Sequence, residues 1–310
     1  MVKVLGARHW VAYGQMTCAM LLIGSLFVVS KVIVQSIPVF VASFLRQFLA
    51  FVALALWLYA QKSPLPQIHQ RDYWVLFIQG FVGIFLFSVF ALYGLRLTNA
   101  IDANIITSTT PLSMMLIAVL LLGERLTARR MGALGLALLG TLAINVLGTH
   151  EAGTRQEVWL GNALVVLAVL AEGVFFGFGK LLKSPISSTW LSLILTGIGS
   201  VLFFPFAAYS AFTNDLSQVS GFVCGLVLYT GVALTAFGVV LMNRGLQQVP
   251  ASTASIFTAL MPVSGVVLSV VFLRESFHWY HALGMVLVLL AMMLVMSERK
   301  APLDAPSSAY

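Results

Sequence analysis

Two stretches of this chain, 151 residues apart, decide its fold. Residues 93–124 read YGLRLTNAIDANIITSTTPLSMMLIAVLLLGE, and residues 244–275 read RGLQQVPASTASIFTALMPVSGVVLSVVFLRE. They align without a gap, and the matching pairs are Gly94/Gly245, Leu95/Leu246, Ala100/Ala251, Ala103/Ala254, Ile105/Ile256, Thr107/Thr258, Pro111/Pro262, Ser113/Ser264, Val119/Val270, Leu122/Leu273 and Glu124/Glu275. Chance likeness of two apolar helices is the alternative, but it does not explain prolines and glutamates paired at one spacing. The chain is therefore interpreted as an internal repeat.

The composition around these stretches is typical of a membrane protein. Of 310 residues, 60% are hydrophobic and 9% are charged, and the mean hydropathy is +1.00. A soluble domain carries about 25% charged residues. About 20 apolar residues in a helix cross the hydrocarbon core of a bilayer, and ten such runs are found, at 11–34, 38–60, 73–95, 99–122, 128–147, 158–180, 188–210, 219–243, 250–273 and 278–296. Barrel strands would alternate strictly, so these continuous runs predict transmembrane helices.

Ten helices and one repeat divide the chain into two halves of five helices. We expect these halves at residues 1–150 and 151–297, followed by a disordered cytoplasmic tail at 298–310. Because five is an odd number, the second half enters the membrane from the opposite side. Inverted repeats recur in secondary transporters, which bind their substrate near the midplane between the repeats. The predicted fold class is an all-α integral membrane protein of two inverted five-helix repeats.

The positive charges indicate the orientation of these helices. With the N-terminus inside, inner loops hold twelve Lys and Arg residues, whereas outer loops and outer helix ends hold four. Cytoplasmic loops carry this excess in membrane proteins. Both termini are therefore predicted to be cytoplasmic, in a multi-pass protein of the bacterial inner membrane.

Several function classes are disfavoured. The net charge of +7 sorts by topology rather than gathering on a soluble face, so nucleic acid is not an expected partner. No Walker loop, GxSxG or HExxH pattern occurs, and no cofactor is expected. Cys18 and Cys224 lie within apolar runs and imply no disulfide framework. Glu275, His278 and His281 have spacings that could ligate a metal, but no fourth ligand is evident and no metal site is predicted.

Several segments of both halves resemble one known group of proteins. They are GSLFVVSK at 24–31, LRQFLA at 45–50, TTPLSMMLIAVLLLGERLT at 109–127, FGKLL at 178–182 and MPVSGVVLSVVFLRES at 261–276. The chain resembles the EamA type of the drug/metabolite transporter superfamily over essentially all ten predicted helices. The resemblance implies a bundle of five plus five helices around a central cavity, export of amino acids, other metabolites or toxic compounds, and coupling to an ion gradient. One departure is that Ile23 and Glu172 stand where that family often has tryptophan.

Glu172 is the main candidate for a functional site. It lies within the apolar run LVVLAVLAEGVFFGFG at 164–179. A charged residue at this depth costs at least about 2.5–3.5 kcal/mol, and such residues usually face a cavity or a partner. We interpret Glu172 as a proton-coupling or amine-binding carboxylate; the alternatives are a structural ion pair with Arg46 or Lys31, or a protonated glutamic acid that is hydrogen-bonded to another helix. Phe176, one turn further on, could contact a substrate amine or serve aromatic packing.

Two polar stripes are predicted to line the substrate cavity. On the fourth predicted helix the stripe contains Asn104, Thr107, Ser108 and Pro111, and on the ninth it contains Ser255, Thr258 and Pro262. Each proline removes the N–H group that would bond the carbonyl four residues earlier, so a free carbonyl is expected beside each threonine hydroxyl. The alternative is ordinary kinking, with the threonine hydroxyls bonded to their own backbone.

Arg46 is the remaining candidate. It lies inside the second predicted helix, where it could contact a substrate carboxylate, join an ion pair or extend toward the outer face.

The function predicted from these features is secondary active transport. We expect export of a small metabolite, such as an amino acid, by alternating access, with the bilayer and a small-molecule substrate as partners. A proton is the candidate coupling ion, and a monomer or homodimer is expected. The alternatives are a multidrug or organic-cation efflux transporter and, from another class, a membrane-embedded lipid-modifying enzyme.

Overall fold

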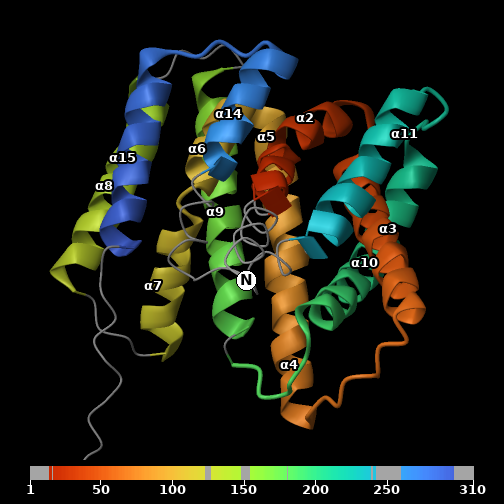
Figure 1. Cartoon of the computed structure of the whole chain (residues 1–310). Helices are drawn as coiled ribbons and strands as arrows, with labels where there is room; N and C mark the ends of the chain where they lie inside the picture. Colours follow the sequence, from red (N-terminus) through yellow and green to blue (C-terminus); the bar gives the residue numbers. More distant parts are fainter. Residues whose placement is uncertain are drawn as a thin grey trace, which may run out of the picture.

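The regular elements of the described chain are helices (Figure 1). The computed structural model describes residues 14–15, 17–122, 127–147, 154–179, 181–238, 240–241 and 260–296. The helices are α2 (Leu26–Ser36), α3 (Val39–Ala60), α4 (Gln70–Ile78), η1 (Gln79–Leu86), α5 (Phe87–Leu97), α6 (Ala100–Thr107), α7 (Thr110–Leu122), α8 (Ala128–Leu147), α9 (Arg155–Gly179), α10 (Ser188–Thr213), α11 (Gly221–Leu228), η2 (Tyr229–Phe237), α14 (Leu260–Leu273) and α15 (Trp279–Met296).

Five helical segments are long and apolar enough to cross a membrane. They are Thr17–Ser36, Val39–Ala60, Gln70–Leu97, Arg155–Gly179 and Ser188–Thr213. Shorter apolar helices occupy Met131–Leu147, Gly221–Phe237, Leu260–Leu273 and Trp279–Leu294. These segments fall within or across nine of the ten predicted runs. The expected tail at 298–310 and the predicted site residues Ser255 and Thr258 lie outside the described residues.

The outside of the bundle is apolar. Leu56 on α3 and Val201 on α10 leave 65% and 74% of their side-chain surface exposed, and Phe212 leaves 91%. Large exposed apolar patches mark surfaces that are covered by something other than water. With helices of this length and composition, the hydrocarbon of a bilayer is the matching environment.

Two membrane segments change helix type in their middle. In Gln70–Leu97 the middle section η1 is π-helical, and η2 forms the second part of Gly221–Phe237. In η2 the Thr235 hydroxyl donates to the carbonyl of Thr230, five residues earlier, at 2.8 Å. Short π-helical sections inside α-helices are frequent at functional sites because they redirect side chains locally.

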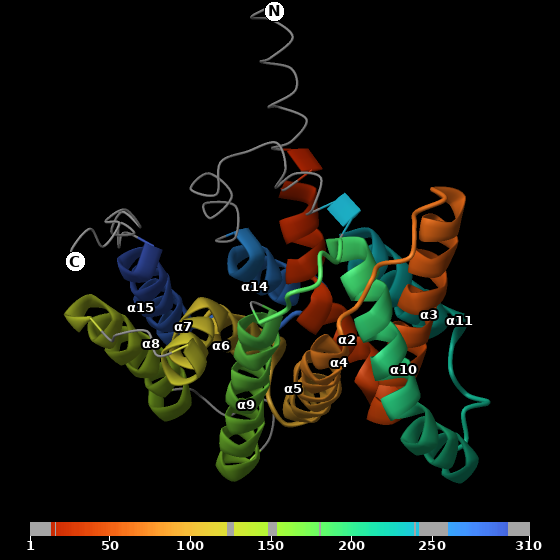
Figure 2. The same ribbon diagram turned by 90° about the horizontal axis from the view of Figure 1, so that it is seen from below.

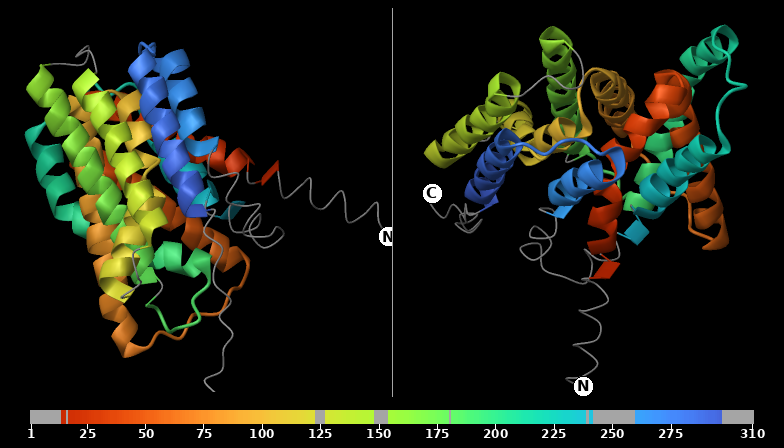
Figure 3. Two further views of the ribbon diagram at one scale, coloured as in Figure 1. Left: turned by 90° about the vertical axis from the view of Figure 1, so that its left-hand side faces the viewer. Right: turned by 90° about the horizontal axis from the view of Figure 1, so that it is seen from above.

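The helices pack in pairs around α9. In Figures 1 and 2, α3 lies beside α10 at one side of the molecule and α8 beside α15 at the other, and both pairs are in contact. The side view of Figure 3 shows α8 and α15 running alongside each other. Between the two pairs, α9 contacts α5, η1, α6 and α7. α9 therefore packs one face against these helices and leaves another face exposed, at Leu160 and Leu167 for example. Glu172 on this helix is half-buried.

Candidate functional site

The fourth predicted run is not one helix but two. α6 ends at Thr107 and α7 begins at Thr110, with a turn at Ser108 and Thr109. The hydroxyl groups of three consecutive residues donate to the carbonyls three residues earlier, at 2.5–2.7 Å; they belong to Ser108, Thr109 and Thr110. These bonds satisfy backbone groups that a break in a helix would leave without partners. Pro111 lies in the first turn of α7, where a proline is tolerated.

One expectation about this break is wrong. The Thr107 carbonyl, expected to be free because of Pro111, accepts the Thr110 hydroxyl at 2.7 Å. The Thr107 hydroxyl bonds its own helix at Ala103 and Asn104. Side-chain hydroxyls are short enough to reach the carbonyls of their own turn, so they replace the missing proline N–H. These bonds match the alternative interpretation, in which the helix is kinked and the threonine hydroxyls bond their own backbone.

The predicted stripe is covered by a neighbouring helix. Asn104, Thr107 and Ser108 are buried. The Asn104 amide donates to the Ala100 carbonyl at 2.8 Å and lies directly against Gly265 of α14. Pro111 is half-buried, and Pro262 on α14 is buried. In this structure the stripe of the first half therefore lies at a helix contact between α6 and α14.

Glu172 is bound to the helix break. Its Oε2 atom accepts the Thr110 hydroxyl at 2.5 Å, which joins α9 to the first turn of α7. Neither of its proposed ionic partners binds it, because Arg46 donates to Ser88 and Lys31 donates to backbone carbonyls. The carboxyl group is thus bonded to a hydroxyl on another helix, which matches the alternative of a glutamic acid hydrogen-bonded to a neighbouring helix.

Phe176 lies one turn from Glu172 on α9. Its ring stands perpendicular to that of Phe175, with the ring centroids 5.2 Å apart. Phe176 is 40% exposed. This is an edge-to-face aromatic pair, and it matches the packing alternative for Phe176 while leaving one ring accessible.

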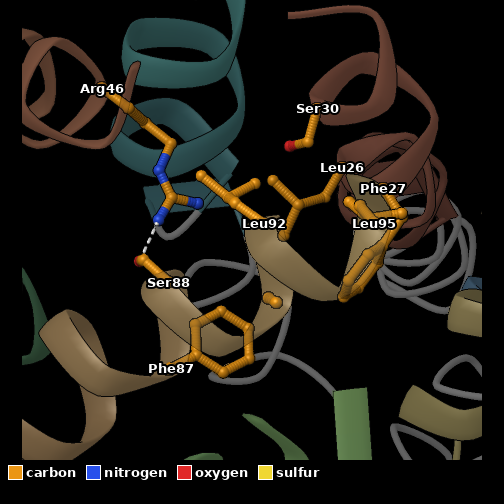
Figure 4. A pocket seen from close by; sticks show the side chains of 9 residues that line it. Leu26, Phe27, Ser30, Arg46, Phe87, Ser88, Leu92 and Leu95 are labelled. Atoms are coloured by element: carbon orange, nitrogen blue, oxygen red, sulfur yellow. Dashed lines mark hydrogen bonds between the residues drawn. The ribbon is translucent and has the colours of Figure 1, made fainter. Parts of the chain in front are cut away.

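Arg46 lies between two small cavities (Figure 4). Its Nη2 atom donates to the Ser88 hydroxyl on α5 at 2.7 Å. Its Nε atom is buried and has no hydrogen-bond partner. No carboxylate of the described residues forms an ion pair with it. On the same turn of α3, buried polar atoms of Ser43 and Gln47 also lack partners.

A buried polar network at the other end of α6 was not predicted. Asp102 and His281 lie with Oδ1 and Nε2 3.2 Å apart, although both residues are almost fully buried. The side-chain N–H group of Asn162 on α9 donates to Asp102 at 3.4 Å and to Asn145 on α8 at 3.0 Å. The Asn162 side-chain oxygen accepts the Thr98 hydroxyl at 2.6 Å. One feature of the sequence could have predicted this network. Asp102, Asn145, Asn162 and His281 are polar residues that each lie one or two turns inside the predicted outer end of an apolar run.

Two charged residues bind helix ends in the same region. Both carboxylate oxygens of Glu275 accept backbone N–H groups at the start of α6, from Ala100 at 2.8 Å and Ile101 at 2.9 Å. Lys31 donates to the carbonyls of Leu95 and Thr98 near the end of α5. Each charge opposes the helix dipole at the end it binds. Burial raises the pKa of Glu275, while the two N–H bonds and the charge of Lys31 act against that rise.

Glu275 thus caps a helix of the other half of the chain. Arg274 before it adopts a left-handed backbone conformation (φ 54°), which ends α14 and turns the chain toward α6.

Apolar helices that keep carboxylates, a guanidinium and amides inside the bundle define a multi-pass membrane protein of the transporter class. The sequence profile of the EamA-like transporter family matches residues 10–146 and 159–297. The chain belongs to the EamA-like transporter family, within the drug/metabolite transporter superfamily.

Similar proteins agree with this assignment. The chain is 34% identical over 308 residues to "Uncharacterized transporter YetK" of Bacillus subtilis, covering 98% of this chain and 92% of that protein. It is 28% identical over 141 residues to an "Uncharacterized transporter" of Archaeoglobus fulgidus, covering 45% of this chain and 49% of that one. A solved crystal structure aligns with 93% of this chain and 95% of its own, with a TM-score of 0.62 at 16% identity, which supports the fold alone.

Proposed function

We propose that this protein is a secondary active exporter of a small metabolite, such as an amino acid, and that it works by alternating access. The observation that carries the proposal is the bond between Glu172 and Thr110, at a helix break inside the bundle. Ionisable residues at membrane depth mark substrate and ion pathways. Discontinuous helices form the binding sites of many secondary transporters.

An arrangement of two inverted halves is part of the proposal, and paired contacts support it. Gly24 lies against Ser264, and Gly173 lies against Ser113. Gly24 matches Gly173 in the repeat, and Ser113 matches Ser264, so each contact is the other with the halves exchanged. A pseudo-two-fold axis between inverted repeats produces pairs of this kind.

The helix pairs support the same arrangement. The contacts α3–α10 and α8–α15 each join equivalent helices of the two halves. The contact of η1 with α9 is matched by that of η2 with α2, and the contact of η1 with α10 by that of η2 with α3. In the proposed cycle the two halves rock about these contacts and open the site to one side at a time.

Proton coupling through Glu172 is the proposed source of energy. A carboxylate held by one hydroxyl can release its proton to one side and take it from the other as the helices move. The Thr110 hydroxyl can accept a hydrogen bond from protonated Glu172 while donating its own proton to the Thr107 carbonyl, or it can turn that proton to the ionised carboxylate. The contact between α7 and α9 therefore persists in both states. The protein would then exchange a proton for the exported molecule.

The test compares Glu172→Gln with wild type in proteoliposomes. The glutamine keeps the size and hydrogen-bonding capacity but cannot ionise, so we expect uptake driven by a pH gradient to fall at least tenfold. Counterflow exchange, which needs no net proton movement, should continue. Glu157→Gln, on the exposed start of the same helix, is the matched control and should transport normally. Gradient-driven transport at the wild-type rate in the Glu172 variant would contradict the proposal.

Export of an organic cation is the second candidate function. It is favoured by the carboxylate of Glu172 one turn from the exposed ring of Phe176, since cations bind both groups. A screen of amino acids and cationic drugs, by growth tolerance and efflux in cells with and without the protein, separates the two substrate classes.

A further inference from the structure

The guanidinium of Arg46 has one bonded nitrogen, Nη2, and one buried nitrogen, Nε, without a partner among the described residues. We infer that it binds the carboxylate of the transported molecule, which makes that molecule a small organic acid or amino acid with an apolar body. This inference rests on the proposed transport function and names the substrate class for it. Its basis is the geometry around Arg46, which was one of several alternatives at the level of sequence.

Two cavities meet at this side chain. Each has about 10 Å³ of free volume, roughly the room of one water molecule, so a substrate would enter only as the helices separate in the proposed cycle. One cavity is lined by residues of α2, α3 and α5, and the other also reaches η2 through Thr230. Ser30, Arg46 and Leu92 line both. In Figure 4 the guanidinium extends from α3 toward Ser88 and Leu92, with the Ser30 hydroxyl across the open space. The site therefore combines helices of the first half with one helix of the second.

Arg46 is half-buried, and the described residues supply only part of the hydrogen bonding that its guanidinium can form. A buried charge is strongly disfavoured unless it is paired and hydrogen-bonded. Ser88 accepts one bond from Nη2, but Nε is buried and unpartnered, and no described carboxylate forms an ion pair with the group. Arginine is always protonated and presents a planar fork that matches a carboxylate. A substrate carboxylate would supply the missing charge and the missing acceptor together.

The other residues that line the site determine which chemical group can lie next to the substrate carboxylate. Apart from Arg46, Ser30 and Ser88, the first cavity is lined by apolar side chains, including Leu26, Phe27 and Phe87. Such walls favour a hydrocarbon group next to the anionic head, as in most ligand sites that combine an apolar lining with a few polar groups. The hydroxyls of Ser30 and Ser88 can donate to the second carboxylate oxygen.

The experiment measures thermal stabilisation of the purified full-length protein by small probes. L-leucine and hexanoate carry the carboxylate; L-leucinamide and hexanamide are the same molecules without it, and inorganic phosphate and chloride are the competing anions. A ligand that binds only the folded protein raises its melting temperature. We expect the two carboxylates to stabilise wild type and the amides not to do so. Arg46→Gln should raise the dissociation constant of the carboxylates roughly tenfold or more, the loss expected for a charge-assisted hydrogen bond.

Arg96→Gln is the matched control, because Arg96 lies on α5 outside both cavities and bonds the Val34 carbonyl; it should bind carboxylates like wild type. Equal stabilisation of Arg46→Gln, stabilisation by the amides, or stabilisation by phosphate or chloride alone would overturn the inference. If Arg46→Gln does not fold, Arg46→Lys replaces it: it keeps the charge without the fork, and unchanged carboxylate affinity would equally overturn it. Transport of an amine or neutral probe, unaffected by Arg46→Gln, would reject the carboxylate site while the transport function stands.

Discussion

Gly24 and Gly173 are the residues at which the backbones of the two halves approach most closely in equivalent places. A Cβ atom at Gly24 would lie 2.6 Å from the Met261 carbonyl oxygen, and one at Gly173 would lie 2.9 Å from the backbone of Ser113. Both neighbours are backbone atoms, which cannot turn aside as a long side chain can. Small residues let transmembrane helices pack this closely.

We expect Gly24→Ala and Gly173→Ala each to destabilise the protein by about 1–3 kcal/mol, the usual cost of overpacking. If the halves are related by a two-fold axis, the two losses should be similar. The melting temperature of the purified variants measures them. Gly225→Ala is the control, because a Cβ atom there meets nothing within 4 Å. Loss of stability in only one of the pair would argue against equivalent contacts.

The charged site residues were predictable from sequence, but their partners were not. Glu172 and Arg46 stand out because each interrupts an apolar run. That Thr110 and Ser88 bind them depends on how helices rotate against each other, which periodicity alone does not determine. His281 illustrates the limit: it lies near the start of the predicted run at 278–296, yet it is only 1% exposed, with its Nε2 atom 3.2 Å from Oδ1 of Asp102.

At the scale of helices, sequence periodicity predicts where apolar runs lie and misses how they are interrupted. The run at 99–122 was predicted as one helix because its apolar character is continuous. The break between α6 and α7 arises from hydroxyl groups at Ser108, Thr109 and Thr110, which compete for the backbone carbonyls. The π-helical sections η1 and η2 left no comparable signal, since one extra residue in a turn leaves composition unchanged.

The buried network of Asp102 ties together the predicted outer ends of several helices. At the start of α6, Asp102 is linked through this network to α15 by His281, to α9 by Asn162 and to α8 by Asn145. Glu275 adds the connection between α14 and α15. These elements come from both halves. In the proposed alternating-access cycle, opening of the outer side would therefore require some of these contacts to separate.

Asp102→Asn and His281→Gln should therefore favour the outward-open state. Both keep hydrogen-bonding capacity but remove the contact between a carboxylate and an imidazole. A loss of about 1–3 kcal/mol shifts the two-state population by roughly five- to 150-fold. The measurement is labelling of Ser30→Cys, in the cavity beside Arg46, by a membrane-impermeant thiol reagent, after replacement of the exposed Cys18 and Cys224 by serine.

Faster labelling in both variants is the expected result. Asp215→Asn, on the exposed connection after α10, removes a carboxylate outside the network and should leave the rate unchanged. If Asp102→Asn and His281→Gln label like the parent, the network is structural and does not close the outer side.

At the scale of the whole molecule, the connections between helices gather at two ends. At one end the α3–α4 connection is bonded to the α9–α10 connection, where Asp72 accepts the N–H and hydroxyl groups of Ser184 at 2.8 and 2.5 Å and the His69 N–H donates to Ser184 at 2.9 Å. At the other end Glu275 binds the start of α6. Apolar contacts among Ile37, Val223 and Leu216 join the α2–α3 corner to the α10–α11 connection.

This division agrees with the orientation proposed from charge. The connections joined through Ser184 contain Lys62 and Lys183, which belong to the lysine- and arginine-rich side. The positive-inside rule predicts that this side is cytoplasmic. Reporter fusions after Lys62 and Lys183 should therefore give a cytoplasmic signal, and fusions at Asn214 and Thr154 a periplasmic one. A fusion at Asn214 that reports the same side as one at Lys183 would mean that α10 does not cross the membrane, and the second half would then not be an inverted copy of the first.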